Sequence, residues 1–216
     1  MDIDGRHSGR SRRWWTGVFG LPVACAITVG CSGGSPTPEI TTYPSPSPSA
    51  RSSALVGAGC ADYAVANPSG PASLESMAED PVTTAVSHNP MLTTLNSVIT
   101  GSMNPGVDFV GLLGIGQHTV FAPTDAAFAA LSPEKAAALR SDSALLNKVL
   151  GYHVVQGQVA PGAVARTHPT IEGSTLTVTR VGENLQVNGA STVVCGGIRT
   201  QNATVYLVDT VLMPPN

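Results

Sequence analysis

The sequence predicts an α+β domain in which helices come first and strands follow. Short apolar segments between residues 60 and 100 repeat with helical spacing and are separated by Pro, Gly and Asn. After residue 174, apolar and polar residues instead alternate as they do in half-buried strands. The 216-residue chain is 42% apolar, which suffices for the core of one ordinary domain with appendages.

The charge composition excludes one class of partner. The chain has 11 Lys and Arg against 14 Asp and Glu, a formal net charge of −3. Several of its arginines precede residue 31, so the part expected to remain after export is more acidic still. Nucleic acid is densely negative, and proteins that bind it need a basic surface. We therefore expect no nucleic-acid partner.

Residues 1–30 have the features of a lipoprotein export signal. A pair of arginines precedes an uncharged run from Trp14 to Gly30, which is marginal in length for a membrane span. The run ends at Cys31 in a pattern that resembles the bacterial lipobox, although Thr28 stands where that motif usually has Leu. Cys31 is thus the expected lipid attachment site, and a diacyl anchor supplies the two chains that stable membrane attachment needs.

This signal predicts an exported protein on the outer face of the bacterial cytoplasmic membrane or in the cell wall. The alternatives are a secreted protein cut near Gly30 and an uncleaved anchor. A released form beside the tethered one is compatible with the same sequence.

Residues 31–53 are expected to be a tether rich in Ser, Pro and Thr. Such a segment cannot bury enough apolar surface to fold. Its reach would be about 26 Å as a flexible coil and about 70 Å as an extended rod, and either length lifts a domain clear of the lipid headgroups. Exported Ser/Thr-Pro stretches are common O-glycosylation sites, and Thr41 and Thr42 are the first candidates. An unmodified spacer is the alternative.

The cysteines predict one disulfide bond. Cys25 lies within the signal and Cys31 is the proposed lipid site, which leaves Cys60 and Cys195. The sequence has no Cys-x-x-Cys motif and no His/Cys cluster that would indicate a zinc or redox site. In an exported domain two such cysteines most simply form a disulfide, and closing so long a loop is worth about 5 kcal/mol in the chain-entropy treatment. Two buried thiols are the alternative.

The domain is predicted to span residues 54–216. The helical pattern covers residues 60–66, 73–79, 82–88, 91–100, 133–140 and 144–150. The strand pattern covers residues 175–179, 184–187 and 204–212, with turn residues between the first two and after the second.

The stretch from Thr119 to Leu131 is expected to be a strand that turns into a helix. The strand ends at Pro123, and Thr124 or Asp125 then offers a side-chain oxygen to the free N–H groups of the new helix. We expect Asp125 to be a helix cap and not a general acid.

Residues 119–131 resemble the first signature of the fasciclin-like domain. Tyr152-His153, followed by two valines, is similar to the central Tyr-His element of that family, and residues 202–214 are similar to its second signature. With the tether and the lipobox, the three motifs make the chain resemble the secreted and surface lipoprotein antigens of mycobacteria in this family. The resemblance implies two β-sheets packed roughly perpendicular to each other, with helices around them.

The resemblance also implies adhesion or surface recognition. In animal relatives the Tyr-His region is implicated in integrin binding, so Tyr152 and His153 are the expected partner-binding residues. A packed, hydrogen-bonded core pair is the alternative for both. The expected partner is a host cell-surface or matrix protein of the integrin-like class. Through its acylated N-terminus the protein would also be a ligand of host Toll-like receptors, and we expect a monomer.

A second class of function is a carrier of a small apolar ligand of the lipid or carotenoid type. Some fasciclin-like proteins bind such ligands, and the apolar helices within residues 82–113 would border a groove. A ligand that copurifies would distinguish this alternative from adhesion.

No catalytic residue, cofactor or metal site is expected. The five histidines are scattered without the spacing of metal ligands. Residues 30–34 match a Gly-x-Ser-x-Gly pattern, but they lie at the processing site and not on a strand-to-helix turn. The sequon at Asn202 is discounted because it stands at the entry to an expected buried strand.

Overall fold

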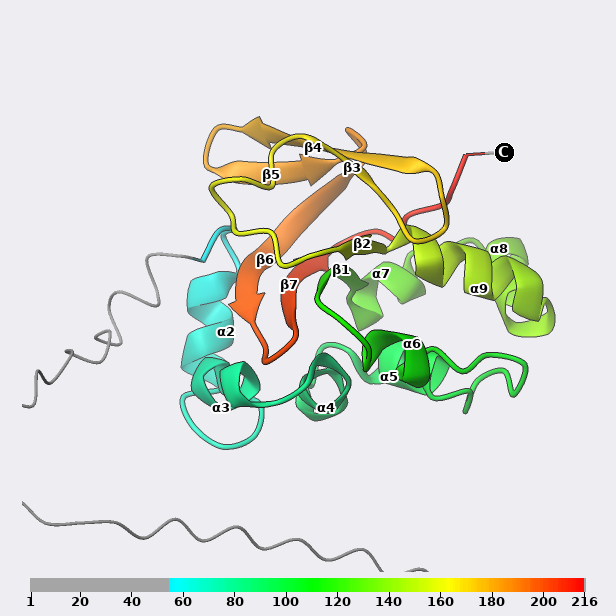
Figure 1. Cartoon of the computed structure of the whole chain (residues 1–216), viewed down its shortest axis with the longest axis horizontal. Helices are drawn as coiled ribbons and strands as arrows, with labels where there is room; N and C mark the ends of the chain where they lie inside the picture. The colour runs from blue at the N-terminus through cyan, green and yellow to red at the C-terminus, as the bar shows by residue number, and fades with distance from the viewer. Residues whose placement is uncertain (1–54, 216) are drawn as a thin grey trace, which may run out of the picture. The chain divides into compact units, whose positions relative to one another are not determined.

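The computed structural model describes residues 55–215 (Figure 1). The predicted export signal, the lipid attachment at Cys31 and the glycosylation candidates Thr41 and Thr42 lie outside the described residues.

Helices dominate the first part of the described chain. They are α2 (Cys60–Ala66), α3 (Leu74–Glu79), α4 (Val82–His88), α5 (Thr93–Ile99), α6 (Val110–Leu113), α7 (Asp125–Ala129), α8 (Pro133–Ser141) and α9 (Ser143–Tyr152). No helix between residues 55 and 215 is long and apolar enough to cross a membrane.

Polar side chains fix where several helices begin. The first N–H groups of a helix have no partner within it, and a side-chain oxygen just before the helix supplies one. Ser73 caps α3, Thr124 caps α7 and Ser132 caps α8 in this way. Asp142 ends α8 and caps α9 through the Leu145 N–H at 2.9 Å, so a single residue joins these two helices.

The strands form one continuous sheet that folds into two layers. They are β1 (His118–Pro123), β2 (Val154–Gln156), β3 (Thr167–Pro169), β4 (Thr175–Val181), β5 (Asn184–Val187), β6 (Ser191–Arg199) and β7 (Ala203–Val208). Their order is β2-β1-β7-β6-β5-β4-β3. β1 and β7 are parallel, and the other neighbours are antiparallel.

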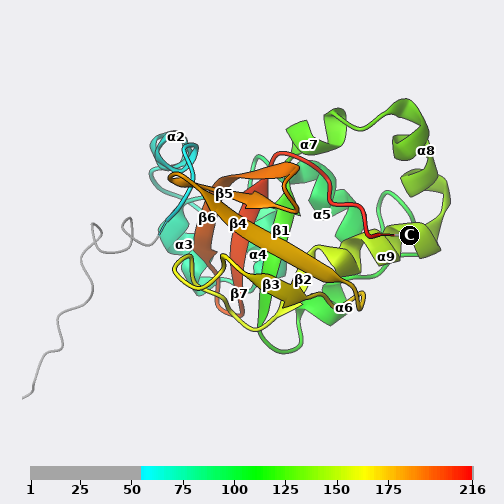
Figure 2. The same cartoon turned by 90° about the horizontal axis from the view of Figure 1, so that it is seen from above.

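Strand β6 connects the two layers. Figures 1 and 2 show β3, β4 and β5 above β1, β2 and β7, with β6 running from one layer to the other. Its pairing with β7 is interrupted by register shifts at Val193/Cys195 and at Gly196/Ile198. Such bulges bend a strand and increase its twist. The predicted α+β class and fasciclin-like arrangement of two strand layers with helices around them are confirmed.

The sequence pattern did not predict β6, and two glycines explain why. Gly196-Gly197 interrupts the apolar alternation, and glycine is normally unfavourable inside a strand. Here Gly197 adopts φ +82, and a Cβ at position 196 would collide with the ring of Tyr206. The glycines therefore permit the bend and the close approach of the aromatic ring.

The predicted disulfide bond is present. Cys60 and Cys195 are bonded, with their Cα atoms 4.7 Å apart. The bond connects α2, the first helix of the domain, to β6 in the middle of the sheet.

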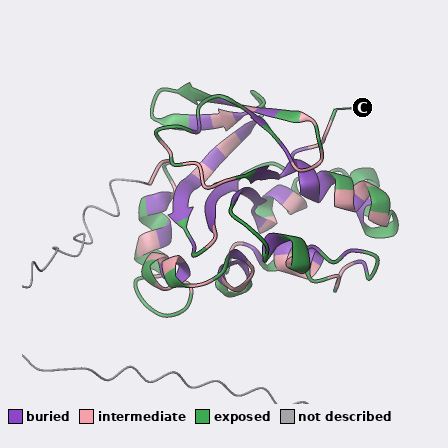
Figure 3. Ribbon diagram, viewed as in Figure 1, coloured by how far each residue is buried: buried purple, intermediate pink, exposed green. Residues whose placement is uncertain are grey.

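The core has two parts, visible as buried segments in Figure 3. One lies between the helices and the lower strand layer and includes Met77, Leu92 and Leu146. The other fills the space between the two strand layers, where the rings of Phe121 and Tyr206 stack with centroids 5.4 Å apart.

Candidate functional site

Tyr152 and His153 lie at the corner between a helix and a strand. Tyr152 is the last residue of α9, His153 caps the C-terminal end of this helix, and β2 begins at Val154. Both side chains are 3% exposed. The apolar residues on either side continue into the core, which explains why the sequence buries the pair.

The imidazole of His153 connects α9 to the C-terminal segment. Its Nδ1 lies 2.7 Å from the carbonyl oxygen of Val149, and its Nε2 lies 3.0 Å from the backbone nitrogen of Leu212. The Leu212 N–H must donate, so Nε2 is the acceptor and the proton resides on Nδ1, which donates to Val149. Burial lowers the pKa of His153 to about 4, against the opposing effect of the bond to Val149. The ring is therefore neutral near pH 7.

The hydroxyl of Tyr152 connects α9 to the upper strand layer. It donates to the carbonyl oxygen of Thr175 at 3.1 Å and accepts from the side-chain amide of Asn188 at 2.8 Å. Asn188 adopts φ +53 in the turn between β5 and β6, and its amide oxygen accepts from Thr177 N–H at 2.9 Å. The hydroxyl thus holds this turn against the end of the helix.

All the polar atoms of the two side chains are occupied within the domain. A group that binds a partner directly or transfers protons must reach the other molecule. The structure gives the pair a structural role in the observed conformation, and their direct contact with a partner stays a prediction.

Asp125 acts as a helix cap, but for a different helix from the expected one. Thr124 caps α7, whereas the carboxylate of Asp125 accepts from Thr94 N–H at 2.7 Å and from the Thr93 hydroxyl at 2.7 Å, at the start of α5. Burial alone would raise the pKa of Asp125, but the hydrogen bonds from Thr94 and Thr93 outweigh burial and lower it. This cap explains why α5 begins at residue 93 and not at 91.

Asn202 connects three segments of the fold, a role that the sequence pattern did not predict. Its amide oxygen accepts from Val82 N–H and its amide nitrogen donates to the carbonyl oxygen of Leu113, each at 2.8 Å. The turn between β6 and β7 is thereby joined to α4 and α6. The sequence signal was present, because Asn202 opens the second signature motif.

The other buried histidines also bind carbonyl groups. His118 Nε2 lies 2.7 Å from the Ile115 oxygen, and His168 Nε2 lies 2.8 Å from the Val164 oxygen. Within residues 55–215, no group of three His, Cys, Asp or Glu side chains is arranged to hold a metal ion.

The helices within residues 82–113 border two small cavities of the described chain. One has a volume of about 40 Å³ and is lined by Thr94, Val98 and Met103 among others. The other has a volume of about 20 Å³, and its lining includes Ile99, Phe109 and His153. Spaces of these sizes hold about one to a few water molecules and are too small for a lipid or carotenoid. Binding of an apolar ligand beside these helices therefore stays a prediction.

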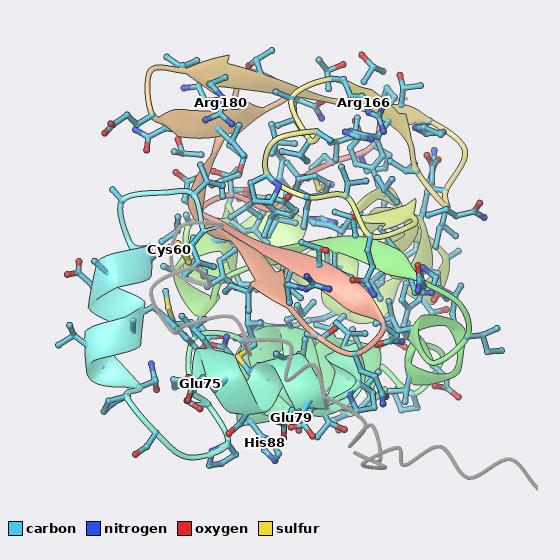
Figure 4. The ribbon with its side chains drawn as sticks, turned by 60° about the vertical axis from the view of Figure 1, so that its left-hand side comes forward. Cys60, Glu75, Glu79, His88, Arg166 and Arg180 are labelled. Atoms are coloured by element: carbon cyan, nitrogen blue, oxygen red, sulfur yellow. A yellow bond between two sulfur atoms is a disulfide. The ribbon has the colours of Figure 1, made fainter. Side chains whose placement is uncertain are left out.

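Charge is segregated over the surface of the domain. Residues 55–134 include no Lys or Arg, and all the Lys and Arg side chains of the described chain lie within residues 135–199. Figure 4 shows Glu75, Glu79 and His88 on the helices at the bottom of the domain, with Arg166 and Arg180 on the upper strand layer. Asp80 Oδ2 lies 3.6 Å from His88 Nδ1 on the helical side.

The chain matches known proteins over most of its length. Residues 85–214 match the fasciclin domain. The chain is 52% identical to the immunogenic protein MPB70 of Mycobacterium bovis over 169 residues, which cover 78% of this chain and 87% of that protein. It is 46% identical to the cell surface glycolipoprotein MPB83 of the same species over 203 residues, which cover 89% of this chain and 92% of that protein.

A solved structure, a FAS1 domain pair from the insect cell adhesion molecule Fasciclin I, has the same fold. It matches with a TM-score of 0.55 and 15% sequence identity, covering 64% of this chain and 52% of that one. Our chain thus spans about half of that domain pair. The resemblance inferred from the three motifs is confirmed, and the chain belongs to the fasciclin domain family.

Proposed function

We propose that the protein is a non-enzymatic surface lipoprotein that acts by recognition. A diacylglycerol on Cys31 would hold it to the bacterial membrane, and the tether of residues 31–53, glycosylated at Thr41 and Thr42, would display the domain. The domain would bind a host cell-surface or matrix protein, and the acylated N-terminus would engage host Toll-like receptors.

The observation that carries this proposal is the extent of the match to a cell surface glycolipoprotein. Residues 55–215 make up about three quarters of the chain, whereas the match covers 89% of it. The similarity therefore extends beyond the described domain into the segment that holds the predicted signal and tether.

The geometry supports recognition over catalysis. Tyr152, His153 and Asp125 bind groups of their own domain, which leaves none of them free to act on a substrate. A folded domain whose charge differs between its faces is suited to binding a partner at one of those faces.

The helical face of α2, α3 and α4 is the best candidate for this contact. It carries Asp62, Glu75, Glu79 and Asp80 and has no basic residue other than His88. A surface that carries charge of one sign attracts a partner of opposite charge and increases the rate of association. A basic surface on a host matrix or cell-surface protein would fit it.

The anchor is tested with Cys31→Ser, and Cys25→Ser in the signal is its matched control. We expect Cys31→Ser to lose membrane retention and Toll-like receptor signalling while the domain stays folded, and Cys25→Ser to keep all three. Signalling by an endotoxin-free Cys31→Ser preparation would show that the lipid is not its cause.

The recognition face is tested on immobilised matrix proteins over a range of salt concentrations. Glu79→Lys should weaken binding to the matrix protein. Added salt should also weaken binding by the parent protein, because salt screens the charges. Glu183→Lys reverses an exposed charge in the turn after β4 and should leave binding unchanged. Equal losses in both variants would exclude the helical face as the contact.

A further inference from the structure

Both lysines of the chain line the same surface groove. The groove has a volume of about 350 Å³ and is bordered by Lys135 of α8, Leu145 and Lys148 of α9, and Met213, Pro214 and Pro215. The sequence has no other lysine. Small-molecule sites usually begin at roughly 300 Å³, so the groove is large enough for a small ligand.

The fold builds this groove from two elements that are distant in sequence. Asp142 joins α8 to α9 without a loop, which sets Lys135 and Lys148 on adjacent helices. The opposite wall is the segment after β7, whose Leu212 is buried and bonded to His153 at the end of α9. In Figure 2 the C-terminal end of the described chain lies over α9.

The wall formed by the C-terminal segment is apolar. Proline has no N–H group, so Pro214 and Pro215 present rings and cannot extend a strand. With Leu145 and Met213 they supply a surface that favours a hydrocarbon chain. Leu145 and Lys148 are three residues apart on α9, and side chains with this spacing lie on the same face of a helix.

The two ammonium groups differ in their surroundings. Lys148 Nζ lies 3.7 Å from Glu172 Oε1, and its side chain is 48% exposed. The hydrogen bonds from Ser174 lower the pKa of Glu172, with Lys148 contributing further, so this carboxylate is ionised and offsets part of the Lys148 charge. No carboxylate in residues 55–215 pairs with Lys135, which is exposed. The edge of the groove therefore carries a net positive charge.

We propose that this groove binds a single-chain amphiphile with an anionic carboxylate or phosphate head. The hydrocarbon chain lies along Leu145, Met213 and Pro214, and the head is held between Lys135 and Lys148. A lysine ammonium has three donors, so Lys148 can keep its ion pair with Glu172 while it donates to the head. This site is separate from the acidic helical face and does not depend on the recognition role.

The test measures laurate and dodecanol binding by titration calorimetry, using the full chain with Cys31→Ser so that no covalent acyl group competes. Laurate should bind saturably and more tightly than dodecanol. The double variant Lys135→Ala/Lys148→Ala should weaken laurate binding about tenfold, about 1.4 kcal/mol, and leave dodecanol binding unchanged. The double variant Arg166→Ala/Arg199→Ala removes two exposed charges elsewhere and should retain laurate affinity.

Three results would overturn the proposal. They are the absence of saturable laurate binding, equal losses in the lysine and arginine variants, and dodecanol binding as tight as laurate binding. Vesicles with an anionic lipid form a further arm. Lysine-dependent binding to vesicles without binding of monomeric laurate would assign the lysines to a bilayer surface and refute the site.

Discussion

The two hydrogen bonds of His153 make a quantitative prediction about stability. The variant His153→Phe keeps an aromatic ring but can bind neither the Val149 carbonyl nor the Leu212 N–H. Both groups would remain buried without this partner, and each such loss costs about 1–3 kcal/mol. We expect the free energy of unfolding near pH 7 to fall by about 2–6 kcal/mol, with the C-terminal segment loosened most.

The same residue should make stability depend on pH. The pKa of His153 is about 4 in the folded protein, against 6.5 for an unperturbed histidine. Between these values the unfolded chain binds a proton that the folded protein does not, so stability falls as the pH falls. The contribution of His153 to the free energy of unfolding is complete above pH 6.5 and lost below pH 4. At 1.36 kcal/mol per pKa unit, this contribution is about 3 kcal/mol.

Urea unfolding followed by far-ultraviolet circular dichroism would measure both effects. The parent and His153→Phe proteins are compared above, within and below this pH window, because their difference isolates His153 from the carboxyl groups. His88→Phe is the control, since His88 is exposed and loses at most a surface ion pair worth below about 1 kcal/mol. If His153→Phe kept the stability and pH dependence of the parent, the assigned tautomer and its bonds would be wrong.

Three further substitutions test other connections in the fold. Asp125→Ala should lower the free energy of unfolding by about 1–2 kcal/mol because α5 loses its cap, whereas Asp108→Ala, at an exposed carboxylate, should change it little. Gly196→Ala should cost about 1–3 kcal/mol because its methyl group meets the Tyr206 ring, while Gly162→Ala, where the space is open, should be nearly neutral in the same melts. Cys60→Ser should cost about 2–5 kcal/mol, and a reducing agent should lower the melting temperature of the parent but not of this variant.

Local patterns predicted much of the fold because their physical causes are local. Helical spacing, alternation and capping residues act within a few positions, and they placed α2, α4 and β5 at the ranges observed. The disulfide followed from composition and compartment. Strand β6 was missed since its glycines are explained only by Tyr206, which comes from the neighbouring strand.

The candidate site was harder to predict because its partners are distant in sequence. Tyr152-His153 lies among apolar residues, which indicated burial. The partners that decide its role are Asn188 and Leu212, which come from a turn and from the last segment. Asp125 was recognised as a cap, but no local pattern shows that it serves a helix more than 30 residues earlier.

The position of the disulfide would suit a domain displayed on the proposed tether of residues 31–53. A pull on such a tether would enter the described domain at Leu55 and first meet the paired backbones of Val56 and Gly196, whose two hydrogen bonds are 2.7 and 3.0 Å long. It would then meet the bond from Cys60 to Cys195. Both connections lead into β6, which is paired with β5 on one side and β7 on the other. We therefore expect the centre of the sheet to bear such a force before α2 unwinds. The loss of stability expected for Cys60→Ser measures how much of the stability depends on this covalent connection.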